Sequence, residues 1–364
     1  MSQPILEVRA LKVTRGGVTV LDIPGLTIME GEFLSFIGPN GAGKSTLLLS
    51  LAVLLKPSTL DMRFRGMPIT RGAGLLDYRR RLAMVFQDPL LFDTNVFNNV
   101  ASGLKIRGMA GSRIKAVVEE NLSLFGIAHL ALRSARKLSG GEAQRTSLAR
   151  AFATQPEIVL LDEPFTSLDP PTKKAVVADL GRVLRTRRAT VIMATHDRMD
   201  AVRLSDRIAV MDCGRIVQTG TPFEVMHHPA TEAVAAFVGI DTMLAGTVVH
   251  ARDGMLEVSV DGRVVVAAGD FALGDHVLCL VHPEHVMIFP KDGRLDFSAR
   301  NRFTGTVARI DPLGPLMRIE IDCGFILAAY VTRLAMEEMG FSRGMEVNAA
   351  FKATSVHVIR NTRA

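Results

Sequence analysis

The spacing of apolar residues along the chain changes after Pro229. Before that point, short runs of consecutive aliphatic residues indicate strands buried on both faces, as in a parallel sheet. These runs are Leu82–Phe86, Ile158–Leu161 and Ala189–Ala194. After Pro229, apolar and polar residues alternate, as in strands of small all-β modules. The pattern predicts an α/β domain over residues 1–240 and a β-rich domain over residues 241–364.

Further strands and one helical segment complete the predicted α/β domain. Strands are expected at residues 5–11, 18–23, 26–28 and 32–37, and a closing hairpin at residues 207–212 and 215–219. Residues 95–132 have helical spacing, with Val96, Val100 and Leu104 on one face. We therefore expect a helical subdomain, at about residues 88–150, inserted between the two halves of the α/β domain.

An internal repeat organises the last third of the chain. Gly246-Thr-Val-Val and Gly305-Thr-Val-Ala open two similar β-rich stretches with a period of about 59 residues. The second stretch carries an inserted helix at Arg333–Met339. The prediction is two short OB-like barrel modules, at about residues 243–290 and 298–360, preceded by a helix at Thr231–Val238.

A glycine-rich loop follows the strand predicted at residues 32–37. Its sequence is Gly38-Pro39-Asn40-Gly41-Ala42-Gly43-Lys44-Ser45-Thr46, and an apolar helix is predicted next at Leu47–Leu55. The strand–loop–helix context and every spacing match a phosphate-binding loop. In such a loop the backbone N–H groups surround the phosphates, Lys44 reaches the β- and γ-phosphates, and Ser45 offers its hydroxyl to Mg²⁺. The chain is therefore expected to bind a nucleoside triphosphate.

Two acidic residues end the aliphatic run Ile158–Leu161. Asp162, at the carboxyl end of a buried strand, is predicted to hold Mg²⁺, and Glu163 is predicted to be the general base for the attacking water. Gln87 and His196 follow two other predicted strands. We expect Gln87 to face the nucleotide, and His196 to orient the water and the γ-phosphate.

A second anion site is predicted where a helix starts at Ser139. Ser139 and Glu142 have capping-box spacing, and Gly140 and Gly141 leave backbone N–H groups uncovered at the positive end of the helix dipole. An ordinary capped helix is the alternative. Since one nucleotide does not need two such sites on one subunit, we expect this one to contact a nucleotide bound to another copy of the chain.

Composition narrows the choice of partners. The net charge is +6, which suits nucleic acid, an anionic membrane surface or phosphate ligands. Nucleic acid is the weakest of these, because the chain has no Trp and only 2 Tyr to stack on bases. We see neither a membrane-spanning run nor a signal peptide, and the 3 Cys lack metal-ligand spacing.

Taken together, these motifs resemble the nucleotide-binding subunit of ATP-binding cassette (ABC) transporters. The resemblance covers residues 1–240. It implies a homodimer that sandwiches two ATP molecules, in which Ser139, Gly140 and Gly141 of one copy close over the γ-phosphate of the other. It implies a catalytic role for Gln87 in Mg²⁺ binding and water sensing, and a role for Asp169 across the dimer interface.

The same resemblance implies partners and a location. Integral membrane permease subunits would dock near residues 88–100, an extracytoplasmic solute-binding protein would deliver the cargo, and the chain would lie on the cytoplasmic face of the cell membrane. One departure concerns adenine, which the family stacks on an aromatic residue where this chain has Val13-Thr14-Arg15. We expect the Arg15 guanidinium to take over this contact.

The C-terminal repeats resemble the molbindin-type (TOBE) modules of tungstate and molybdate importers. Tetrahedral oxyanions need converging N–H, hydroxyl and cationic donors. The residues expected to supply them are Ser298, Arg300, Lys352 and Ser355. Tungstate is favoured over molybdate as the cargo. The alternatives are a sulfate, sugar or polyamine importer with a purely structural C-terminal domain, and a soluble ABC ATPase acting on nucleic acid or ribosomes.

Overall fold

The computed structural model describes residues 3–69, 72–187, 189–291 and 298–361. The chain forms two compact units, Met1–Val225 and Met226–Ala364. This division falls before the predicted one at residue 240, because the connecting segment packs within the second unit. There, the rings of His228 and His357 lie 5.1 Å apart, and His357 Nε2 lies 3.1 Å from the Pro229 carbonyl oxygen.

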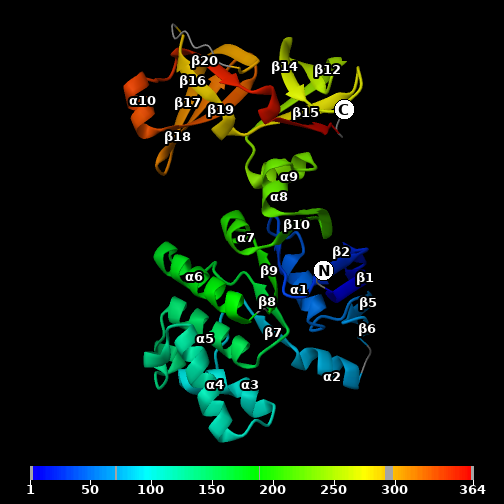
Figure 1. Cartoon of the computed structure of the whole chain (residues 1–364), viewed down its shortest axis with the longest axis vertical. Coiled ribbons are helices and arrows are strands. Elements are labelled where there is room, and N and C mark those ends of the chain that lie inside the picture. Colours follow the sequence, from blue (N-terminus) through cyan, green and yellow to red (C-terminus); the bar gives the residue numbers. More distant parts are fainter. Residues whose placement is uncertain (1–2, 70–71, 188, 292–297, 362–364) are drawn as a thin grey trace. The chain divides into compact units, whose positions relative to one another are not determined.

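A six-stranded sheet in the order β11-β10-β4-β9-β8-β7 forms the centre of the first unit (Figure 1). Its strands are β4 (Phe33–Ile37), β7 (Leu82–Val85), β8 (Ile158–Asp162), β9 (Thr190–Thr195), β10 (Arg207–Asp212) and β11 (Arg215–Gly220). All neighbours are parallel except β10 and β11. Along β8, Ile158 and Leu160 belong to one hydrophobic core, whereas Val159 and Leu161 belong to another. The continuous aliphatic run therefore reflects burial of both faces of the sheet, as predicted.

A second sheet, which is antiparallel, packs against the central sheet across the first of these hydrophobic cores. It contains β1 (Pro4–Arg15), β2 (Val18–Ile23), β3 (Leu26–Met29), β5 (Thr59–Phe64) and β6 (Met67–Pro68). The sequence pattern predicted the first three strands and missed the last two. Only Met62 and Phe64 of β5 are buried, so its apolar signal is too short to stand out.

Seven α-helices lie entirely within the described part of the first unit. They are α1 (Lys44–Leu51), α2 (Ala73–Arg80), α3 (Val96–Ile106), α4 (Gly111–Leu124), α5 (Gly140–Ala153), α6 (Pro170–Arg187) and α7 (Arg198–Leu204). The helix predicted at Leu47–Leu55 instead starts at Lys44 and ends before Val53, whose φ is 53°. The predicted helical segment 95–132 is interrupted at Gly108 and Gly126, which adopt φ of 74° and 68°.

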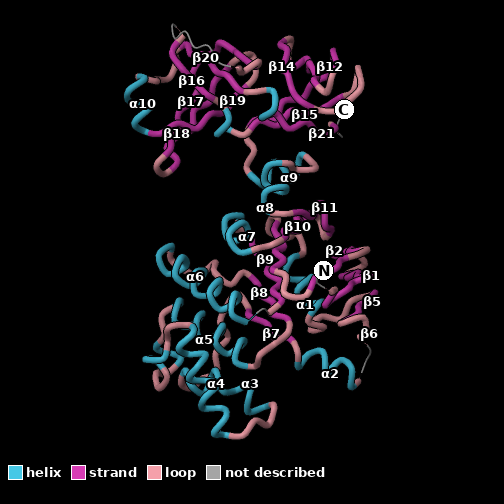
Figure 2. The backbone as a smooth tube through the Cα atoms, in the orientation of Figure 1, coloured by secondary structure: helices cyan, strands magenta, loops and turns pink. Residues whose placement is uncertain are grey.

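The second unit consists mainly of strands, arranged in two five-stranded sheets (Figure 2). The first sheet has the order β14-β13-β12-β15-β21 and the second has the order β16-β20-β17-β18-β19. The first repeat supplies β12 (Thr242–Arg252), β13 (Met255–Val260), β14 (Arg263–Ala268), β15 (His276–Val281) and β16 (Met287–Pro290). The second supplies β17 (Asn301–Leu313), β18 (Leu316–Asp322), β19 (Ile326–Thr332), β20 (Glu346–Phe351) and β21 (Val356–Arg360). The helices are α8 (Pro222–His227), which starts in the first unit, α9 (Glu232–Val238) and α10 (Arg333–Met339).

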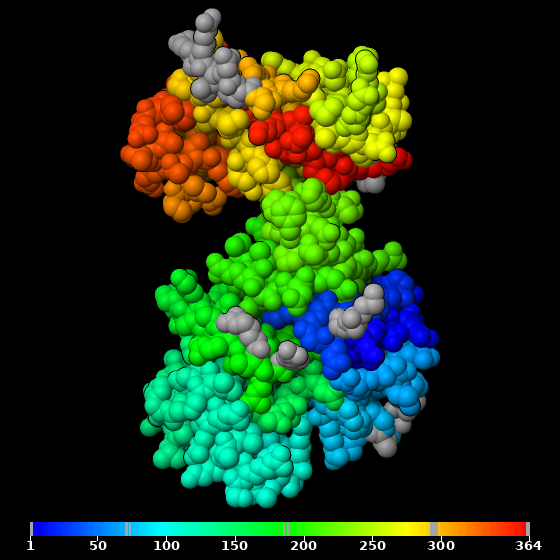
Figure 3. Space-filling view, viewed as in Figure 1, coloured from blue at the N-terminus to red at the C-terminus, as the bar shows by residue number. Residues whose placement is uncertain are grey.

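The two repeats exchange their last strands. β16 of the first repeat pairs with β20 of the second, and β21 of the second pairs with β15 of the first. Figure 3 shows the red C-terminal segment lying against the yellow part of the first repeat. The two predicted repeats are therefore interlocked, because each sheet contains one strand from the other repeat and both sheets share one hydrophobic core.

The repeated glycines have the same structural role in both sheets. A Cβ on Gly246 would lie 2.5 Å from the Ser259 carbonyl oxygen, and one on Gly305 would lie 2.5 Å from the Asp322 carbonyl oxygen. Only glycine fits where the neighbouring backbone approaches so closely. Among the described residues, no helix has both the length and the apolar composition needed to cross a membrane.

Candidate functional site

The glycine-rich loop turns sharply out of β4 and leads into α1. A Cβ on Gly38 would lie 2.1 Å from the Met211 carbonyl oxygen, and Gly43, with φ of 98°, directly precedes the helix. The loop curls around Lys44, whose Nζ donates to the carbonyl oxygens of Gly38 (2.8 Å) and Pro39 (3.1 Å). Burial lowers the pKa of Lys44, while the carboxylates of Glu163 and Asp162 act in the opposite direction. The loop thus holds a buried cation beside two acids.

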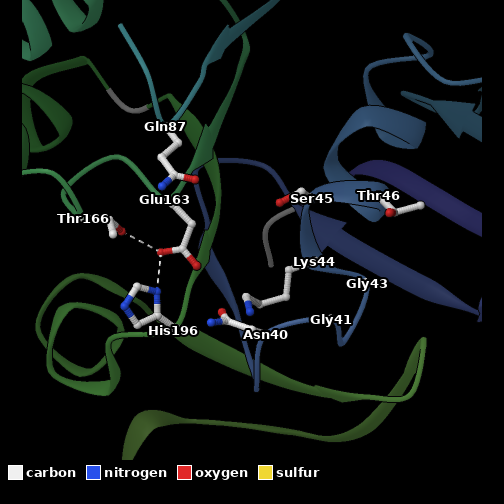
Figure 4. Close-up of a pocket in the computed structure, with 10 residues that line it drawn as sticks. All are labelled: Asn40, Gly41, Gly43, Lys44, Ser45, Thr46, Gln87, Glu163, Thr166 and His196. Atoms are coloured by element: carbon white, nitrogen blue, oxygen red, sulfur yellow. Dashed lines mark hydrogen bonds and ion pairs between the residues drawn. The ribbon is translucent and has the colours of Figure 1, made fainter.

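A cavity of about 410 Å³ opens beside this loop (Figure 4). The predicted site residues that line it are Asn40, Gly41, Gly43, Lys44, Ser45, Thr46, Gln87, Glu163 and His196. The carboxyl ends of β4, β7, β8 and β9 and the start of α1 bring them together. A further lining residue, Thr166, was not predicted.

Three oxygen-bearing side chains form the edge of the site next to α1. Ser45 Oγ donates to Asp162 Oδ1 at 2.8 Å, and Gln87 lines the same cavity. Burial raises the pKa of Asp162, although the bond from Ser45 opposes the effect. Hydroxyl, carboxylate and amide oxygens are the ligand types that Mg²⁺ prefers. The donor set therefore fits the predicted magnesium site.

Glu163 is held in an uncommon backbone conformation. Its φ is 46°, in the left-handed region that non-glycine residues rarely adopt, and its N–H donates to the Ala194 carbonyl oxygen at 2.9 Å. The residue is 9% exposed. Strained backbone of this kind occurs where the surrounding structure fixes a side chain for function.

One carboxylate oxygen of Glu163 receives two hydrogen bonds. Oε2 lies 2.8 Å from His196 Nδ1 and accepts from Thr166 Oγ1 at 3.0 Å. Figure 4 shows the other oxygen directed toward Lys44. The arrangement leaves one oxygen of a fixed carboxylate free to take a proton from a water in the cavity. The sequence signal for Thr166 was its position three residues after Glu163, which lets a tight turn bring the hydroxyl back to the carboxylate.

Several predicted residues lie outside this cavity lining. Ser139 accepts from Glu142 N at 3.3 Å and Glu142 Oε2 accepts from Ser139 N at 2.7 Å, which confirms the capping box. Asp169 accepts from Thr172 N at 3.2 Å at the start of α6. Also outside the lining are Arg15, at the exposed end of β1, and Gly140 and Gly141, at the start of α5. Within the site itself, the lining lacks Gly38, Pro39 and Ala42 of the loop, and Asp162 at the end of β8.

The predicted oxyanion residues lie near two neighbouring strand ends of the second unit. In the antiparallel pairing of β17 with β20, Asn301 lies opposite Phe351. Arg300, which precedes Asn301, and Lys352, which follows Phe351, therefore lie next to the same residue pair. Both side chains are exposed, as is Ser298, whereas Ser355 is half-buried. The convergence of the four donors on one anion stays a prediction.

Comparison with known proteins places these features in a family. The ABC transporter family matches residues 21–166, and the TOBE domain matches residues 298–358. WtpC of Pyrococcus horikoshii, a molybdate/tungstate import ATP-binding protein, is 36% identical over 336 residues, which are 91% of this chain and 93% of WtpC. The chain belongs to the ATP-binding proteins of ABC transporters.

Other ABC proteins match as well, over longer or shorter parts of the chain. PotA of Mesorhizobium japonicum, a spermidine/putrescine import ATP-binding protein, is 32% identical over 351 residues, covering 95% of this chain and 94% of PotA. The solved structure of cbiO1 from Clostridium perfringens, part of the ABC transporter complex cbiONQ, is 31% identical, with a TM-score of 0.58 over 62% of this chain and 91% of cbiO1. The predicted fold class, a P-loop domain followed by a TOBE domain, and the predicted role as the ATPase subunit of an ABC importer are confirmed.

Proposed function

We propose that this ABC ATPase powers the import of a tetrahedral oxyanion, with tungstate favoured over molybdate. The observation that carries the proposal is the match to WtpC across 91% of the chain, since it includes both the ATPase and the C-terminal unit. The exposed Arg300 and Lys352, which flank one strand pair, supply charge suited to an oxyanion.

At the ATP site, each residue has a role that follows from its contacts. Lys44 would exchange its loop carbonyl oxygens for the β- and γ-phosphates. Ser45, Asp162 and Gln87 would hold Mg²⁺, which offsets the phosphate charge during hydrolysis. Glu163 would accept a proton from the attacking water, while Thr166 and His196 keep its carboxylate oriented.

A second copy of the chain would complete the site. Ser139, Gly140 and Asp169 are exposed and lie outside the cavity that contains Lys44. The capped start of α5 presents backbone N–H groups and the positive end of its dipole, which suit a γ-phosphate. We infer a head-to-tail homodimer in which these residues, together with Gly141, contact the partner's ATP.

The segment after Gln87 would dock the permease subunits. Leu90 and Phe92 are 63% and 56% exposed although both are large and apolar. Contiguous apolar exposure of this kind marks an interaction surface. As the ATPase subunit of an importer, the protein would be peripheral to the membrane. A solute-binding protein would deliver the cargo, which would then pass through the permease subunits.

The identity of the cargo can be tested by measuring the tungsten and molybdenum content of cells. A strain lacking this chain is expected to accumulate less tungsten and molybdenum, measured by mass spectrometry, and wild-type protein but not Glu163→Gln should restore uptake. Unchanged tungsten and molybdenum together with lowered spermidine uptake would favour the polyamine alternative, which the similarity to PotA supports. In parallel, calorimetry of the full chain with tungstate, molybdate and sulfate tests the C-terminal oxyanion site; no micromolar binding would exclude it.

A further inference from the structure

Helix α6 is anchored to the helix that is proposed to face the partner's ATP. A Cβ on Gly141, at the start of α5, would lie 2.3 Å from Thr172 Cγ2 on α6, so the two helices touch there. Further along, Arg145 of α5 forms an ion pair with Asp179 of α6. Because of these contacts, we expect α5 and the first half of α6 to move together.

The same part of α6 reaches the segment that carries His196. Lys173 Nζ lies 2.8 Å from Asp200 Oδ2 and also pairs with Asp197. Burial raises the pKa of Asp200, whose residue is only 3% exposed. Burial acts to lower the pKa of Lys173, but its hydrogen bonds to the two carboxylates raise it overall. Lys173 is therefore the cation that these two acids share.

Asp197 transmits this contact to the hydrolytic site. Its Oδ1 accepts from the N–H groups of Met199 (2.8 Å) and Asp200 (3.2 Å) and so caps α7. Asp197 directly follows His196, whose Nδ1 lies 2.8 Å from Glu163 Oε2. A displacement of Asp197 would move the histidine away from the general base.

We propose that Lys173 is a positioning residue for His196 and that it connects the two ATP sites of the dimer. This inference depends on the proposed function. In the dimer, α5 of one copy contacts the partner's ATP, while His196 of that copy acts on its own ATP. Through α6 and Lys173, closure of α5 on one nucleotide fixes the histidine at the other.

The first test is Lys173→Met, with Lys174→Met as the matched control because Lys174 is the exposed neighbour on the same helix. In Lys173→Met we expect kcat for MgATP to fall about ten- to a hundredfold, the cost of a misplaced catalytic group. KM should change less than about twofold, since the loop around Lys44 is untouched, and the Hill coefficient for ATP should fall toward one. Lys173→Arg should recover most of the rate, and Lys174→Met should behave as wild type.

A double-mutant cycle separates positioning from general stability. In a His196→Ala background, Lys173→Met should leave the residual rate unchanged, because its effect acts through the histidine. An equal further loss in that background would overturn the proposal. If Lys173→Met folds poorly, Lys173→Met/Asp200→Asn removes the buried charge as well and should show the same kcat loss.

The outcomes for the proposal and for the function it rests on are distinct. Wild-type protein that stays monomeric with bound MgATP would overturn the proposed dimer, and the inference with it. Active wild type with Lys173→Met and Lys174→Met indistinguishable in kcat and Hill coefficient would overturn the role of Lys173 alone.

Discussion

At the residue scale, the central feature is that the surrounding structure holds the Glu163 carboxylate in one orientation. Its backbone lies in the left-handed region, and His196 and Thr166 both contact the same carboxylate oxygen. A general base is effective when its geometry is set before the substrate arrives. The sequence predicted Glu163 and His196 from their places after strands, but not Thr166, because its contact depends on a turn that many sequences can form.

Replacing the carboxylate tests the assignment of the base. Glu163→Gln keeps the size of the side chain and one acceptor oxygen for Thr166 and His196, but it cannot accept the proton. We expect ATP affinity to remain within about twofold and kcat to fall by about 10²–10⁴, the usual contribution of a general base. Equilibrium binding of a fluorescent ATP analogue and steady-state phosphate release measure the two quantities. Glu157→Gln, just before the opposite end of β8 and outside the cavity lining, is the control, and comparable activity in both variants would contradict the assignment.

Arg15 allows a separate test of how adenine is recognised. If its guanidinium stacks on the base, Arg15→Ala should weaken ATP binding several-fold and leave kcat nearly unchanged, because the phosphates and the water are bound elsewhere. Calorimetric titration of Glu163→Gln and of Glu163→Gln/Arg15→Ala with ATP measures the difference without turnover. Equal affinity in the two proteins would exclude the stacking contact.

At the element scale, predictions based on local patterns succeeded, including the hairpin of β10 and β11, whereas the long-range exchange of strands was not predicted. The phosphate-binding loop, β8 and the capping box of α5 are each encoded in consecutive residues, so the sequence predicted them. The exchange of β16 and β21 joins strands that are far apart in the chain, as in the pairing of Val281 with Val356. Alternation of apolar residues shows that a strand exists but not which partner it takes.

The strand exchange predicts that the first repeat cannot fold alone. A fragment of residues 243–290 leaves β15 without β21 and β16 without β20, so it should be largely unfolded by circular dichroism. A fragment of residues 226–364 retains both sheets and their shared core and should unfold cooperatively. Cooperative unfolding of the short fragment would show that the exchanged strands are dispensable.

At the scale of the whole molecule, the account depends on two copies sharing their ATP sites. Each chain contains a complete set for phosphate binding and proton removal around Lys44 and Glu163, while its Ser139 lies outside that cavity. We therefore propose that closure over the γ-phosphate comes from another copy. In the proposed dimer α6 would connect the two sites, since it contacts both α5 and the segment after His196.

The most direct measurement is the mass of Glu163→Gln in solution, by light scattering, with and without MgATP. To test the geometry, two proteins are prepared in a Cys213→Ser background, one carrying Ser139→Cys and the other carrying Asn40→Cys. The two proteins are mixed and then mildly oxidised. The account predicts a dimer that forms only with MgATP, together with an ATP-dependent disulfide between the two populations. A protein that stays monomeric with bound MgATP, or a dimer in which these cysteines never meet, would contradict it.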